Sequence, residues 1–107
     1  MYLLDTNVCI RYLNGRSEAI MRRLRQESPA DIAVCSVVKA ELFYGAQRSH
    51  NPKRSLDKQQ LFLGPFHSFP FDDAAAEQYG RIRAELAAKG TPIGPNDLLI
   101  AAITLAN

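Results

Sequence analysis

The chain has 107 residues, of which 47% are hydrophobic and 22% charged, and its formal net charge is +2. This length fits one small domain, so we expect residues 1–107 to form a single globular unit. The composition excludes a disordered chain. No apolar stretch approaches the ~18 residues that a membrane-spanning helix requires. The net charge is too mild to establish a nucleic-acid partner by itself.

Two cysteines, Cys9 and Cys35, lie in apolar surroundings and lack the spacing of a metal site. We expect buried free thiols, which suit the reducing cytoplasm. The first residues do not read as a secretory signal, which favours the same compartment. His50 and His67 are too isolated to indicate a zinc site or a catalytic triad.

Short apolar runs alternate with helical patterns along the chain. The predicted strands are Tyr2–Asp5, Asp31–Cys35 and Ser68–Phe71. The predicted helices are Val8–Leu13, a segment between Ser17 and Pro29, Val37–Gln47, Asn51–Leu63, a long helix from Asp72 or Asp73 to Lys89, and Asp97–Ala106. Strands that alternate with helices predict an α/β fold whose parallel sheet has helices on both sides.

Capping residues set several of these helix boundaries. We expect Ser17 and Ser36 to be the N-caps of the helices that follow them, and Asn96 to open the last helix. That last helix is apolar almost all round from Leu98 to Leu105, which predicts that it is buried.

The first notable acid, Asp5, follows an apolar run and precedes Thr6 and Asn7. Ligands of open α/β sheets bind outside the carboxyl ends of the strands, and Asp5 would stand at such an end. An ordinary turn is the alternative, because Asp, Thr and Asn all favour turns.

Two further acids, Glu41 and Asp97, map to the same end of a parallel sheet. Glu41 lies among apolar helical residues, although an exposed helical acid is the alternative. Asp97 begins a helix, where the helix dipole alone would favour an acid. Three neighbouring carboxylates repel one another unless they bind a cation. Hard oxygen ligands suit Mg²⁺ or Mn²⁺, which commonly act on substrate phosphates.

Three sequence blocks carry a family resemblance. They are Leu4-Asp5-Thr6-Asn7, Glu41-Leu42 with Gly45 behind it, and Pro95-Asn96-Asp97-Leu98-Leu99-Ile100-Ala101-Ala102. In this order and spacing they resemble the signature blocks of PIN-domain ribonucleases, most closely the VapC-type toxins of toxin–antitoxin pairs.

The resemblance implies a three-layer α/β/α sandwich and endonucleolytic cleavage of RNA that depends on Mg²⁺ or Mn²⁺. It implies that Asp5, Glu41 and Asp97 form the acidic metal site, with Thr6 and Asn7 supporting it through hydrogen bonds. It also implies an antitoxin protein that covers the cleft, and dimers of the toxin.

The sequence departs from the family pattern at its end. The resemblance implies two more strands after Asn107, with a fourth acidic position after the first of them. The first of these strands would lie beside Tyr2–Asp5, so we expect that strand to have an open edge. We therefore expect a homodimer or higher oligomer that exchanges elements, or marginal stability.

Two rival functions stay open at this point. A weakened PIN module would bind antitoxin or RNA without efficient turnover, because fold and function separate easily. Phosphoryl transfer through an aspartyl-phosphate also places an acid after the first strand, but position 7 is Asn where those phosphatases have Asp.

The four tyrosines, Tyr2, Tyr12, Tyr44 and Tyr79, are candidates to stack on RNA bases, although core or interface packing is favoured for at least Tyr79. Tyr44, one turn beyond Glu41, is a candidate to line the cleft. The basic residues form two clusters, Arg22, Arg23 and Arg25, and Arg48, Lys53, Arg54 and Lys58. A pair of solvated helix faces is the usual interpretation, and a rim that holds phosphates is the alternative.

Overall fold

A computed structural model describes all residues, 1–107, and contains one three-stranded sheet. The strands are β1 (Tyr2–Leu4), β2 (Ile32–Cys35) and β3 (His67–Phe69). They pair in the order β1-β2-β3, and both pairs are parallel. The predicted α/β fold with a parallel sheet is confirmed, and each strand lies within two residues of its predicted bounds.

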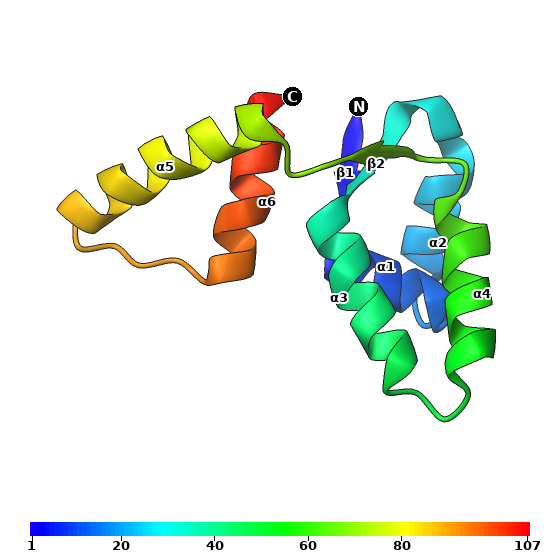
Figure 1. The fold of residues 1–107 in the computed structure, drawn as a ribbon. Helices are drawn as coiled ribbons and strands as arrows, with labels where there is room; N and C mark the ends of the chain where they lie inside the picture. Colours follow the sequence, from blue (N-terminus) through cyan, green and yellow to red (C-terminus); the bar gives the residue numbers. More distant parts are fainter.

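Six α-helices and one short 3-10 turn connect and cover the strands. The helices are α1 (Thr6–Leu13), α2 (Glu18–Gln26), α3 (Ser36–Gln47), α4 (Pro52–Leu63), α5 (Asp73–Ala88) and α6 (Pro95–Ala106), and the 3-10 turn is η1 (Pro29–Asp31). Figure 1 shows α5 and α6 as a hairpin on one side of the sheet and α1 to α4 on the other. Helices therefore flank both sides of the sheet, as the resemblance implies. None of these helices has both the length and the apolarity needed to cross a membrane.

The core is centred on β2. All four β2 residues are buried, which is typical of a parallel strand covered on both faces. The same core contains Leu4 of β1 and Leu63 of α4, and helices α5 and α6 contribute Ala75 and Ile103. Only 14 of the 107 residues are buried, so the fold depends on this small set.

Helix α3 is held in place by contacts from α4. The Gln59 side-chain amide donates to the Leu42 carbonyl at 2.9 Å, which ties α4 to α3. The Phe62 ring stacks on Tyr12 of α1 with ring centroids 4.5 Å apart. These contacts fix α1, α3 and α4 as one block, and α3 carries one of the predicted site acids.

Three predicted helix starts, those of α1, α3 and α6, are late by one or two residues. The N-cap of α3 is Cys35, and Ser36 is the first helical residue. The Ser36 hydroxyl instead accepts a hydrogen bond from the Phe71 amide at 3.2 Å, so it links α3 to the segment that leads into α5. Helix α6 begins at Pro95, after Gly94, because proline is favoured in the first helical turn, where no N–H donor is needed.

The prediction that the last helix is buried is wrong for part of its surface. Leu98, Ala102 and Ile103 are buried, but Leu105 is 56% exposed. Helix α6 packs chiefly against α5, with a smaller contact to α3, so only part of its circumference is covered.

The edge of β1 is open, as the resemblance implies. Strand β1 is the end strand of the sheet, and an apolar groove of about 290 Å³ lies between it and α2. Arg23 of α2 closes over this groove by donating to the Tyr2 hydroxyl at 2.9 Å, with its guanidinium 5.1 Å from the ring centroid. The predicted oligomer stays a prediction.

Two leucines of α4 provide a matched test of this core. Leu63 is 1% exposed, whereas Leu61 on the same helix is 82% exposed. We expect Leu63→Ala to lower the free energy of unfolding by about 2–5 kcal/mol, because it removes core contacts and leaves a cavity. Leu61→Ala should stay within about 0.5 kcal/mol of the parent chain. Urea denaturation of both variants measures the difference, and equal losses would contradict the described core.

Candidate functional site

Asp5 lies at the carboxyl end of β1 and is also the N-cap of α1. One of its carboxylate oxygens, Oδ1, accepts a hydrogen bond from the Val8 amide at 2.8 Å. Its backbone carbonyl accepts from the Cys9 amide at 3.2 Å. The residue is exposed. The cap fixes the side chain while its other carboxylate oxygen, Oδ2, has no hydrogen-bond partner in the protein, so Asp5 can offer an oxygen to a ligand.

Glu41 lines a cleft between α3 and α6. The cleft has a volume of about 460 Å³ and is lined by Ser36, Val37, Ala40, Glu41 and Tyr44 of α3 and by Asn96 and Leu99 of α6. Glu41 is half-buried and makes no salt bridge. The alternative of an exposed acid is therefore wrong, and a half-buried carboxylate without a cationic partner in the protein can bind a cation.

Asp97 lies next to the wall of this cleft. It follows Asn96 in the first turn of α6 and is exposed. No side chain caps this helix, so the amides of its first turn favour a negative charge nearby. A Cβ built on Gly94 would lie 3.5 Å from the Asp97 Oδ2, so this carboxylate turns back toward the helix start.

The three acids lie on three elements near the carboxyl ends of β1 and β2, but they are not gathered into one tight group. No three Asp, Glu, His or Cys side chains are close enough together to hold a single metal ion. The convergence of Asp5, Glu41 and Asp97 on one ion stays a prediction. Their donor chemistry suits Mg²⁺, which keeps several waters and needs only one or two carboxylates.

The supporting hydrogen bonds expected from Thr6 and Asn7 are not present. Neither side chain hydrogen-bonds to an acid, and Asp5 is held by the Val8 amide instead. Thr6 is half-buried and Asn7 is exposed in the first turn of α1. A supporting role for these two residues stays a prediction.

Both cysteines are free and buried, as predicted. Burial raises the pKa of Cys9 to about 12, and the nearby charge of Asp5 adds to this effect. The Cys9 thiol is therefore protonated at neutral pH and is not a nucleophile.

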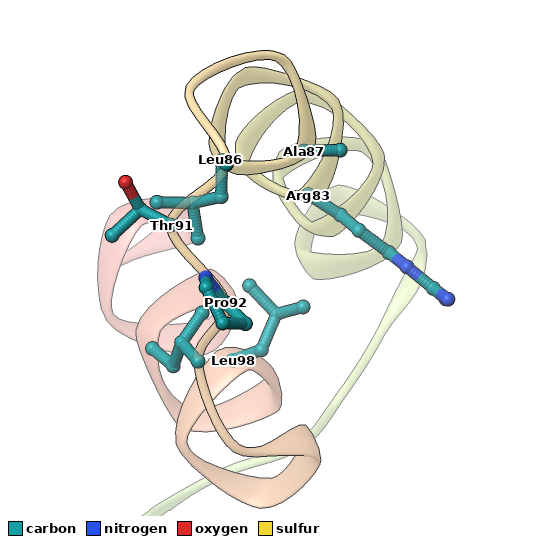
Figure 2. Close-up of a pocket in the computed structure, with 8 residues that line it drawn as sticks. Arg83, Leu86, Ala87, Thr91, Pro92 and Leu98 are labelled. Atoms are coloured by element: carbon teal, nitrogen blue, oxygen red, sulfur yellow. The ribbon is translucent and has the colours of Figure 1, made fainter.

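Another cavity, of about 380 Å³, lies inside the α5–α6 hairpin. Figure 2 shows Pro92 and Leu98 together in it, with Arg83 extending away from them. No acidic residue lines this cavity, so it lacks the ligands of a metal site. The cleft that Glu41 lines is therefore the better candidate for a metal-binding site.

Two α6 residues that line the cleft, Asn96 and Leu99, are not among the predicted site residues. Asn96 was assigned only to the start of a helix, and Leu99 only to an apolar run. Their position in the same block as Asp97 is the signal that could have identified them. Tyr44 does line the cleft, as the sequence suggested.

Comparison with known proteins identifies the family. The model of the PIN domain matches residues 2–107. A curated relative, the tRNA(fMet)-specific endonuclease VapC of Salmonella typhimurium, is 39% identical over 94% of this chain and 75% of its own length. The chain therefore belongs to the PIN-domain family, in its VapC branch.

Other relatives agree with this assignment. Ribonuclease VapC2 of Rickettsia felis is 36% identical over 99% of this chain and 80% of its own length. A crystal structure of DNA-bound VapBC from Salmonella typhimurium superposes with a TM-score of 0.89 at 37% identity. That match covers 98% of this chain and 79% of the other.

Substitutions at Asp5 can separate its capping role from its carboxylate chemistry. Asparagine is as good an N-cap as aspartate, so we expect Asp5→Asn to change the free energy of unfolding by less than about 0.5 kcal/mol. Asp5→Ala removes the acceptor for the Val8 amide and should cost about 0.5–2 kcal/mol. Chemical denaturation distinguishes the two, and equal stability of both variants would contradict the capping role.

The raised pKa of Cys9 predicts a loss of stability at high pH. The unfolded thiol loses its proton near 9.0, whereas the native thiol keeps it up to about 12. The native state thus binds more protons in this window, so its stability is complete below pH 9 and falls as the pH rises toward 12. Between pH 8 and pH 10.5 the parent chain should lose about 2 kcal/mol more than Cys9→Ala. Parallel losses in urea denaturation would contradict the burial of this thiol.

Proposed function

We propose that this chain is an endoribonuclease dependent on Mg²⁺ or Mn²⁺, and the toxin of a toxin–antitoxin pair. The observation that carries the proposal is the cleft between α3 and α6, in which Glu41 is half-buried and Asn96 brings the first turn of α6 to the opposite wall. Asp97 follows Asn96 in the first turn of α6, and Asp5 is the N-cap of α1 at the carboxyl end of β1. The names of the VapC relatives, an endonuclease and a ribonuclease, support the same chemistry.

Asp5, Glu41 and Asp97 are the residues that would hold the ion. When bound, a divalent cation supplies positive charge that polarises a phosphodiester and favours attack by water. Asp5 contributes a carboxylate whose orientation is fixed by the Val8 amide. Glu41 contributes one among the apolar neighbours Val37 and Leu99, where reduced solvent strengthens electrostatic interactions.

The partners follow from the same assignment. Solved relatives are VapBC complexes from Salmonella typhimurium and Rickettsia felis, which supports an antitoxin partner for this chain. Toxin dimers and a cytoplasmic location are part of the proposal, and the two free buried thiols suit a reducing compartment.

One observation favours a second candidate function, a module that binds RNA or antitoxin without efficient turnover. The three acids are not grouped closely enough to hold one ion as they stand. A chain of this kind would bind RNA with or without a divalent ion and would leave it uncleaved.

The test is RNA cleavage during a titration with Mg²⁺ or Mn²⁺. We expect cleavage that requires the ion and falls at least 100-fold in Asp5→Asn, Glu41→Gln and Asp97→Asn, because each removes one ligand charge while keeping the side-chain volume. The matched control is Asp57→Asn, which removes an exposed acid of α4 outside the cleft and should leave the rate unchanged.

Two outcomes decide between the candidates. Cleavage that persists in excess EDTA, or that survives all three substitutions, would exclude the metal-dependent nuclease. RNA that binds but stays intact at saturating Mn²⁺ would assign the chain to the binding module instead.

A further inference from the structure

Tyr44 is a large aromatic residue that the core does not use. Its side chain is 63% exposed, although it lies on α3, a helix whose Val38, Leu42 and Ala46 are all buried. Those three residues follow one another at four-residue spacing and form the core face of the helix. Tyr44 lies outside that face, so packing in this chain does not account for it.

The face of α3 that carries Tyr44 is the wall of the cleft. Val37, Ala40, Glu41 and Tyr44 recur at helical spacing and line the cleft together. Tyr44 follows Glu41 by three residues, which is about 4.5 Å along the helix axis. The ring therefore stands beside the acid on the same wall of the cleft.

Arg48 adds positive charge to the same ring. Its guanidinium lies 5.6 Å from the centroid of Tyr44, one helical turn further along α3. This cation–π contact occupies one face of the ring and restrains it. Arg48 is exposed and forms no salt bridge, so its charge is available to a phosphate.

We propose that Tyr44 stacks on an unpaired RNA base that enters the cleft beside Glu41, while Arg48 contacts the backbone of that nucleotide. This inference rests on the proposed nuclease function and names two residues of this chain that would contact its RNA substrate. Bases inside an RNA duplex are stacked on one another and cannot reach a protein ring, whereas unpaired bases can. An aromatic side chain can stack on any base, so Tyr44 would favour unpaired nucleotides without selecting a base sequence.

The test measures RNA affinity in EDTA by fluorescence anisotropy, so that it does not depend on cleavage. The probes are a short oligouridylate and an abasic oligomer of equal length. We expect Tyr44→Leu to weaken oligouridylate binding about tenfold, within the range known for base–aromatic stacking. Tyr44→Phe keeps the ring and should bind within about twofold of the parent chain. On the abasic oligomer, the parent chain and Tyr44→Leu should bind equally, because the stacking partner is already missing.

Two further measurements sharpen the test. Arg48→Gln should reduce the slope of log affinity against log salt concentration by about 0.7, the value for one phosphate contact on a single strand. The matched control is Tyr2→Leu, which breaks another tyrosine–arginine pair far from Glu41 in sequence and outside the cleft, and it should leave RNA affinity unchanged.

If the parent chain cleaves RNA with Mn²⁺, the KM of Tyr44→Leu should rise about tenfold while kcat stays within about threefold. Unchanged oligouridylate affinity in Tyr44→Leu, or an equal loss on the abasic oligomer, overturns the inference while leaving the nuclease function standing. A change in self-association by sedimentation without a change in RNA affinity assigns the ring to a protein interface and also overturns it. A parent chain that never cleaves RNA defeats the proposed function, and the affinities in EDTA still decide the role of Tyr44.

Discussion

The parallel pairing of β1 with β2 is the constraint on which the site depends. Leu4 lies opposite Val34 in the register. The chain therefore leaves β1 at Asp5 and leaves β2 at Ser36 at the same, carboxyl end of the sheet. Both strands then turn directly into helices, α1 after β1 and α3 after β2. A shift of this register by one residue would turn buried side chains toward the opposite face and would separate Asp5 from α3.

Helix α3 forms one wall of the cleft, because one of its faces packs in the core and the other lines the cleft. Val38, Leu42 and Ala46 hold the helix in the core, and the Gln59 amide of α4 ties its middle through the Leu42 carbonyl. The opposite face, with Glu41 and Tyr44, therefore lies across the cleft from α6. The positions of the cleft side chains thus depend on apolar packing on the opposite side of α3.

The sequence predicted the strands and most helix bounds well, because apolar runs and capping residues are local signals. It failed at Ser36, whose hydroxyl bonds to the distant Phe71 amide, and at Leu105, whose exposure depends on how α6 packs on its neighbours. The convergence of Asp5, Glu41 and Asp97 on one ion stays a prediction. It depends on the angles at which α1, α3 and α6 cross. Side-chain packing decides these angles, and residue spacing along the chain does not encode them.

The central claim is that these three acids share one divalent cation, and anomalous diffraction from crystals soaked in Mn²⁺ tests it most directly. The account predicts a single strong peak at the edge of the sheet between Asp5 and the cleft, with carboxylate oxygens of the three acids bound directly or through water. A peak elsewhere on the molecule, or none at saturating Mn²⁺, would contradict it.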